Sequence, residues 1–146
     1  MSSPAAAGYS GTPLVRKLGI KPETRLGLLA APEDFDATLG ELPPGGRVRR
    51  RLGAEPFDVI VAFFTRGAAL ERRVPALVAA LDPSGGLWLA WPKRASGVAT
   101  DLTDDVVREL GLAAGLVDNK VCAIDPVWSG LRLVFRLRDR AARAGG

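Results

Sequence analysis

The residues best suited to chemistry lie just after a run of apolar residues that ends near position 92. Lys93 and Arg94 supply two cations, Ser96 supplies a hydroxyl group, and Gly97 lets the backbone turn. This set suits the binding of a phosphate or a carboxylate group. The alternative is a solvated loop whose charges only aid solubility. Three further residues complete the candidate ligand-binding set: Arg66, Trp91 and Trp128.

The place of these residues along the chain suggests a common edge. Open α/β sheets bind ligands beyond the carboxyl ends of their strands, and Arg66 and Trp91 both stand where a strand is expected to end. Trp91 and Trp128 would stack on a ring of the ligand, and packing in the core is their alternative role. Trp88 points to the face opposite Trp91 by strand alternation, so we expect it to pack under a helix.

The absence of histidine removes several kinds of chemistry. Ser-His-Asp and Cys-His catalysis are excluded, as are the usual zinc and non-haem iron sites. Asp101, Asp104 and Asp105 stand where helix caps are expected, so we assign no metal site to them. We also assign no catalytic residue and no cofactor. Cys122 is interpreted as a small buried hydrophobe, while Lys120 on the same strand face leaves a reactive thiol as the alternative.

The densest basic cluster consists of Arg47, Arg49, Arg50 and Arg51. Contacts with phosphates are one interpretation of this cluster, and a charged edge strand that deters strand pairing is the other. The chain has five Phe, three Trp and one Tyr, and none of them interleaves with the cluster as a surface for stacking bases requires. We therefore do not expect nucleic acid as a partner.

The composition of the 146 residues is that of one soluble globular domain, with 47% hydrophobic and 25% charged residues. No run approaches the ~20 apolar residues that cross a bilayer, and the first residues lack the pattern of a signal peptide. A single cysteine suits a reducing compartment. We expect a cytoplasmic protein without a membrane partner, with flexible tails over 1–11 and 139–146 and a single α/β domain over 12–138.

The elements that must position these residues follow from hydrophobic periodicity. The run FDVIVAFFT (57–65) indicates a strand covered on both faces. A helix from 68 to 81 follows, then a turn at DPSGG (82–86), a buried strand at 87–91 and a helix at 102–110. The runs 117–124 and 131–137 are joined by a connector too short for a crossover helix, so we expect an antiparallel pair. Weaker strands are predicted at 25–30 and 47–52, which gives an α/β, Rossmann-like, mostly parallel sheet with a C-terminal antiparallel hairpin.

The segment LERRVPALVAALDPSGGLWLA (70–90), together with the element order over 57–138, resembles the C-terminal half of class I methyltransferases. The resemblance implies a methyltransferase-like sheet. It also implies an S-adenosyl donor, held by a glycine-rich turn after the first strand and an acidic residue after the second. Here the first turn reads LLAAPEDF (28–35), in which Pro32 has no amide hydrogen and side chains keep the backbone away from a ligand.

Short sequence words are spread over residues 9–134, and they are similar to those of a family of small proteins found chiefly in actinobacteria. No activity is established for that family, so the resemblance implies a bacterial origin and no reaction. The matching words are YSGTPL (9–14), KLGIKP (17–22), LWLAWPK (87–93), TDLT (100–103), KVCA (120–123) and WSGLR (128–132).

The missing glycine turn leads to a main interpretation: a non-catalytic cytoplasmic protein that binds an anionic small molecule or a protein partner. Whether the protein is an enzyme stays open. One alternative is a divergent S-adenosylmethionine-dependent methyltransferase, with Lys93 or an acidic residue such as Asp101 as its base. The other is a nucleic-acid-associated or regulatory subunit, which would act as a regulator through the segment Tyr9–Lys21.

Overall fold

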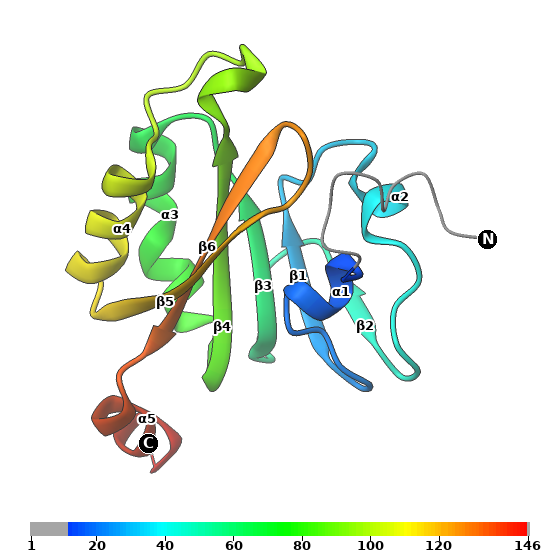
Figure 1. Cartoon of the computed structure of the whole chain (residues 1–146). Coiled ribbons are helices and arrows are strands. Elements are labelled where there is room, and N and C mark those ends of the chain that lie inside the picture. The colour runs from blue at the N-terminus through cyan, green and yellow to red at the C-terminus, as the bar shows by residue number, and fades with distance from the viewer. Residues whose placement is uncertain (1–11, 146) are drawn as a thin grey trace.

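Six strands form one mixed sheet in the computed structural model, which describes residues 12–145 (Figure 1). The sheet order is β2-β1-β3-β4-β6-β5. The first four strands in this order are parallel, and β6 runs antiparallel to both β4 and β5. This arrangement confirms the predicted α/β fold with its C-terminal antiparallel pair. The strands are β1 (Arg25–Leu29), β2 (Arg47–Arg49), β3 (Phe57–Phe63), β4 (Leu81–Pro92), β5 (Leu116–Ala123) and β6 (Trp128–Phe135).

Helices cover both faces of the sheet and divide its core in two (Figure 1). The longer helices α3 and α4 pack on one face, and the short helices α1 and α2 pack on the other. The helices are α1 (Leu14–Lys17), α2 (Phe35–Leu39), α3 (Gly67–Ala79), α4 (Asp104–Ala113) and α5 (Leu137–Gly145), with a 3-10 turn, η2, at Arg94–Ser96. None of the helices in this described part of the chain has the length and apolar character needed to cross a membrane.

Strand β4 contributes to both cores because its side chains alternate between the faces. Leu89 and Trp91 enter the core under α3 and α4, whereas Trp88 enters the core under α1 and α2. Trp88 is fully buried, and its indole Nε1 donates a hydrogen bond to the Leu18 carbonyl oxygen at 3.0 Å. The predicted packing of Trp88 under a helix is confirmed.

The start of β4 differs from the predicted turn at residues 82–86. Leu81 already pairs with Phe57, and the next pair is Val59 with Gly86, so residues 82–85 form a bulge inside the strand. The bulge needs glycine, because a Cβ atom on Gly85 would lie 2.7 Å from the Asp58 carbonyl oxygen. The segment reads as a turn because its pairing partner lies more than twenty residues earlier in the chain.

The two predicted tails have different outcomes. Residues 1–11 lie outside the described residues. Residues 137–145 form helix α5 where the sequence predicts a charged tail from 139. Arg140 Nε donates to the Phe135 carbonyl oxygen at 3.1 Å, which ties the helix to the end of β6. Leu137 at its start is 77% exposed, so this side chain adds little apolar packing between α5 and the domain.

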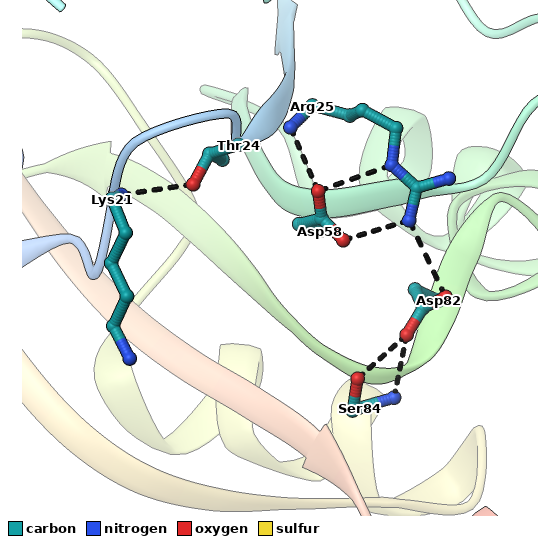
Figure 2. A network of polar contacts seen from close by, with 6 residues as sticks. All are labelled: Lys21, Thr24, Arg25, Asp58, Asp82 and Ser84. Carbon is teal, nitrogen blue, oxygen red and sulfur yellow. Dashed lines mark hydrogen bonds and ion pairs between the residues drawn. The ribbon is translucent and has the colours of Figure 1, made fainter. Parts of the chain in front are cut away.

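A network of charged groups ties the amino ends of β1, β3 and β4 together (Figure 2). The Arg25 side chain on β1 forms two hydrogen bonds with Asp58 on β3. Nη2 lies 2.8 Å from Oδ1, and Nε lies 3.1 Å from Oδ2. The backbone N–H of Arg25 also donates to the same carboxylate at 2.8 Å. Arg25 Nη2 lies 3.5 Å from Asp82 on β4, whose other oxygen accepts a 2.7 Å bond from the Ser84 hydroxyl.

We expect Asp58→Asn to destabilise the protein by about 1 kcal/mol at pH 7, because both side chains are about a third exposed and solvent screens the pair. The side-chain hydrogen bond from Arg25 lowers the pKa of Asp58. This stabilisation is therefore present above the pKa of the unfolded carboxyl group and is lost as the pH falls through the lower folded value. Urea unfolding of wild type and variant should show the difference at pH 7 and little of it near pH 2.

The control for this variant is Asp36→Asn, which breaks the more exposed pair with Arg50 at 2.8 Å. We expect its effect to stay below about 0.5 kcal/mol. Equal losses for the two variants, or an Asp58→Asn effect that persists undiminished in acid, would contradict the role given to the network.

Candidate functional site

The connections of β1 mark the place where this fold can accept a ligand. The chain passes from β1 to β2 on one side and then returns to β3 on the other side of β1. The loops after β1 and β3 therefore diverge at the carboxyl edge of the sheet, and open α/β folds bind ligands at such a point. Among the loops at this edge are residues 30–34 after β1, 64–66 after β3, and 93–103 after β4.

The loop after β1 makes a tight turn without glycine. Ala30 is exposed and has a φ of 56°, in the left-handed region that glycine favours. Such a conformation costs an alanine about 1–2 kcal/mol. Pro32 offers only its carbonyl oxygen, which accepts a hydrogen bond from the Phe35 N–H at 3.0 Å. Asp34 occupies the cap position of α2, yet its side chain makes no capping hydrogen bond.

The loops after β3 and β4 are tied together by two neighbouring side chains. The Thr100 hydroxyl donates to the Thr65 carbonyl oxygen at 2.6 Å and accepts from the Leu102 N–H at 3.0 Å. The Asp101 carboxylate accepts from the Gly67 N–H, the first residue of α3, at 2.7 Å. Asp101, named from the sequence as a possible base, therefore holds the start of α3.

The predicted cationic loop is ordered by its own hydrogen bonds. Ser96 donates its hydroxyl hydrogen to the Lys93 carbonyl oxygen at 2.6 Å and accepts from the Val98 N–H at 3.2 Å. Gly97 closes the turn with a φ of 77°. Lys93 is half-buried, and its backbone N–H donates to the Val127 carbonyl oxygen at 2.7 Å. Arg94 is exposed in the turn. Arg66, also exposed, precedes the first residue of α3.

The structure separates the two tryptophans of the predicted set. Trp91 is buried in the core under α3 and α4, whereas Trp128 packs on the core of the opposite face. Trp128 contacts Phe63 at the end of β3, with ring centroids 5.0 Å apart, and Phe63 contacts Phe35 at 4.9 Å. This aromatic cluster, which the sequence reasoning missed, stands beside the loop after β1. Phe63 lies on the Trp88 face because β3 pairs with β4 in the register Val61 with Trp88, and no pattern local to either strand reveals that register.

The structure offers no metal centre among residues 12–145: no group of three or more His, Cys, Asp or Glu side chains there is placed to hold an ion. Asp105 instead contacts Arg108 at 3.4 Å. Cys122 is half-buried, and burial raises the pKa of its thiol although Lys17, Lys120 and Lys93 act in the opposite direction. A thiol with a raised pKa is mostly protonated near neutral pH and is a weak nucleophile.

The segment after β2 carries positive charge where methyltransferases are expected to hold a ribose with an acid. Arg50 and Arg51 follow the last residue of the strand, and Arg50 Nη2 contacts both oxygens of Asp36 at 2.8 and 2.9 Å.

A cavity of about 20 Å³ lies at the opposite, amino edge of the sheet and has room for about one water molecule. It is lined by Arg25, Arg47, Arg49, Glu55, Pro56 and Phe57.

Comparison with solved structures shows what this fold resembles. A SAM-dependent methyltransferase from Aquifex aeolicus superposes with a TM-score of 0.61 at 13% identity, covering 82% of this chain and 86% of that one. Precorrin-6y C5,15-methyltransferase from Geobacter metallireducens gives a TM-score of 0.59 at 10% identity, covering 93% and 94%. Aeropyrum pernix fibrillarin with natively bound S-adenosyl-L-methionine gives 0.55 at 16% identity, covering 87% and 70%. No protein-family model and no curated protein sequence matches the chain.

These neighbours correct the main interpretation drawn from the sequence. The sequence led us to expect a non-catalytic protein that binds an anionic small molecule or a protein partner, and this prediction was wrong. The structural neighbours are methyltransferases, and the likeness covers most of both chains. The identities are low, so the likeness establishes the Rossmann-like methyltransferase fold and favours the methyltransferase alternative. The error came from the weight placed on one turn, LLAAPEDF, against the arrangement of the whole sheet.

We expect Thr100→Val to destabilise the protein by about 1–2 kcal/mol, because it leaves a buried Leu102 N–H and the Thr65 carbonyl oxygen without their partner. Limited trypsin digestion should also cut faster after Lys93 and Arg94 as loop 93–103 loosens. Thr38→Val is the control, since that hydroxyl makes a long, exposed bond of 3.3 Å to Asp34. Unchanged trypsin cleavage together with equal stability of the two variants would refute the tie.

Proposed function

We propose that this protein is a divergent S-adenosylmethionine-dependent methyltransferase. The observation that carries the proposal is the likeness to methyltransferases over 82–93% of the chain. The turn after β1, at the carboxyl edge, is the proposed seat of the donor. Small side chains at Ala30 and Ala31, the first of them exposed, support this placement.

The residues of this turn fit the donor in part. Glu33 and Asp34 are exposed carboxylates, and the Asp34 side chain is not used as a helix cap. Carboxylate oxygens accept hydrogen bonds from hydroxyl groups such as those of a ribose. The turn does not supply the row of amides of a glycine-rich loop, since Pro32 has no N–H. We therefore propose that Glu33 and Asp34 hold the ribose from the first turn, in place of an acid after β2.

The chain's own contribution to the reaction is positioning and the acceptance of a proton. S-adenosylmethionine, when bound, supplies a methyl group that is open to attack by a nucleophile. The absence of histidine leaves carboxylates, lysines and the single tyrosine to receive a proton from the acceptor. Asp101 is committed to the Gly67 N–H, and Lys93 acts on the Cys122 thiol as a cation, so neither of the two bases named from the sequence is assigned.

The proposal extends to the setting of the protein. We propose a bacterial cytoplasmic enzyme of the actinobacterial family whose words the chain carries. The single cysteine supports a reducing compartment, since Cys122 is a free thiol. Four of the matching words, LWLAWPK, TDLT, KVCA and WSGLR, lie in β4, in the loop tied to α3, in β5 and in β6.

Binding of the donor tests the proposal directly. Isothermal titration calorimetry should detect S-adenosylmethionine and S-adenosylhomocysteine binding to wild type. The double variant Glu33→Gln/Asp34→Asn should bind at least about tenfold more weakly, because charge-assisted hydrogen bonds to the ribose are lost. The matched control is Glu71→Gln/Glu109→Gln, which removes two exposed carboxylates from α3 and α4. Absence of binding by wild type at millimolar ligand would overturn the proposal. Equal affinities for the two double variants would overturn only the assigned ribose contacts.

A further inference from the structure

The half of the sheet formed by β6 and β5 lacks a helix on the side where α1 and α2 lie, as far as the described residues go (Figure 1). Helices α1 and α2 stand over the β1 end of that face. The uncovered part carries a basic pair on β5 and β6, and two further cations, from α1 and from the loop after β4, act on the Cys122 thiol beside that pair. We call it the basic face and define it by Lys17, Lys93, Lys120 and Arg132.

Two cations of the basic face are paired across neighbouring strands. Lys120 on β5 stands directly opposite Arg132 on β6 in the antiparallel register. Like charges in this position destabilise a sheet. None of the ion pairs formed within residues 12–145 involves Lys93, Lys120 or Arg132. The sheet therefore holds adjacent positive charges that no carboxylate of the described chain neutralises.

Arg132 is held in this unfavourable setting by the backbone beneath it. The Arg132 guanidinium lies directly against the backbone of β4 at Gly86. A Cβ atom added at Gly86 would lie 2.7 Å from Arg132 Nη2, so only glycine leaves room for this side chain. Burial lowers the pKa of Arg132, and the positive charge of Arg140 lowers it further. A half-buried guanidinium without a carboxylate partner is costly in the folded protein, and a bound anion would offset that cost.

The remaining cations converge on the same place from other elements. Cys122 lies two residues after Lys120 on the same strand face, and the charges of Lys17, Lys120 and Lys93 all act on its thiol. Lys17 comes from α1 and Lys93 from the loop after β4. Because neighbouring strands lie ~4.8 Å apart and alternate residues ~6.6 Å apart, these charges are spread over a plane and are not gathered in one pocket.

We propose that the basic face binds the phosphate backbone of a nucleic acid. A flat array of separated cations fits a ligand with several spaced negative charges, and guanidinium and ammonium groups are the usual partners of phosphodiesters. Trp128 is half-buried against Phe63, so the contacts are expected to be independent of base sequence. This surface is distinct from the Arg47–Arg51 cluster. If the bound nucleic acid is also the substrate, that role rests on the proposed methyltransferase function, whereas nucleic-acid binding by the basic face does not.

Reversal of the charge of Lys120 separates binding from folding. Lys120→Glu should weaken binding to fluorescein-labelled single-stranded RNA, single-stranded DNA or duplex DNA by at least about tenfold at low salt, measured by fluorescence anisotropy. The same change places a carboxylate opposite Arg132, so the melting temperature should rise or stay level. Arg72→Glu is the matched control, because Arg72 is exposed on α3 and loses the same charge. We expect its affinity to stay within about twofold of wild type.

The arms with RNA, DNA and duplex distinguish which nucleic acid is bound. Absence of binding to all three at 50 mM salt would overturn the proposal, as would equal losses for Lys120→Glu and Arg72→Glu. Equal affinity of wild type for polyglutamate would overturn it in favour of an acidic protein partner. Binding of S-adenosylmethionine is measured in a separate titration. A failure of the methyltransferase proposal therefore does not affect the nucleic-acid result, and a failure of the nucleic-acid proposal does not affect the donor result.

Discussion

The position of β4 between two unlike neighbours is the constraint on which the rest of this structure depends. The strand runs parallel to β3 on one side and antiparallel to β6 on the other, and its side chains fill both cores. The start of β6 is thereby brought to the carboxyl edge, where Trp128 pairs with Pro92 and reaches Phe63. Close packing around β4 demands glycine: a Cβ atom on Gly130 would lie 2.9 Å from Ile124 and 3.1 Å from Trp88.

The carboxyl edge combines a methyltransferase-like arrangement of strands with loops of different local chemistry. An alanine takes the left-handed conformation that glycine would take after β1, and arginines follow β2 where an acid is expected. A hydrogen bond donated by the Thr100 hydroxyl and one accepted by the Asp101 carboxylate hold the loops after β3 and β4 in place. A shared fold permits such replacement, because chemistry resides in the loops while the sheet supplies their positions.

The sequence predicted those parts of the fold that depend on local patterns. The apolar run 57–65, the helical spacing after 68 and the short connector 125–130 each carry their own signal, and β3, α3 and the antiparallel pair follow from them. The bulge at 82–85 and the pairing of Lys120 with Arg132 depend on register with distant strands. A one-residue slip moves every side chain to the other face, so no local pattern reveals them.

The candidate site was less predictable than the fold for the same reason. Alternation along one strand separates Trp88 from Trp91, but the face of Trp128 depends on which strand it pairs with. Asp101 looks like a free carboxylate in the sequence, and only the approach of α3 shows that it is occupied. The functional interpretation failed where it treated one departure from a motif as decisive for the whole chain.

The hydrogen bond between Trp88 and Leu18 makes the segment before β1 an integral part of the interior. A chain shortened to start after residue 21 would leave the Trp88 indole N–H without an acceptor in apolar surroundings. It would also leave a cavity where Leu18 and Ile20 pack. Residues 18–20 therefore cannot leave the domain without loss of this packing. Loss of an associated molecule on such trimming would report damage at the centre of the domain as readily as loss of a recognition element.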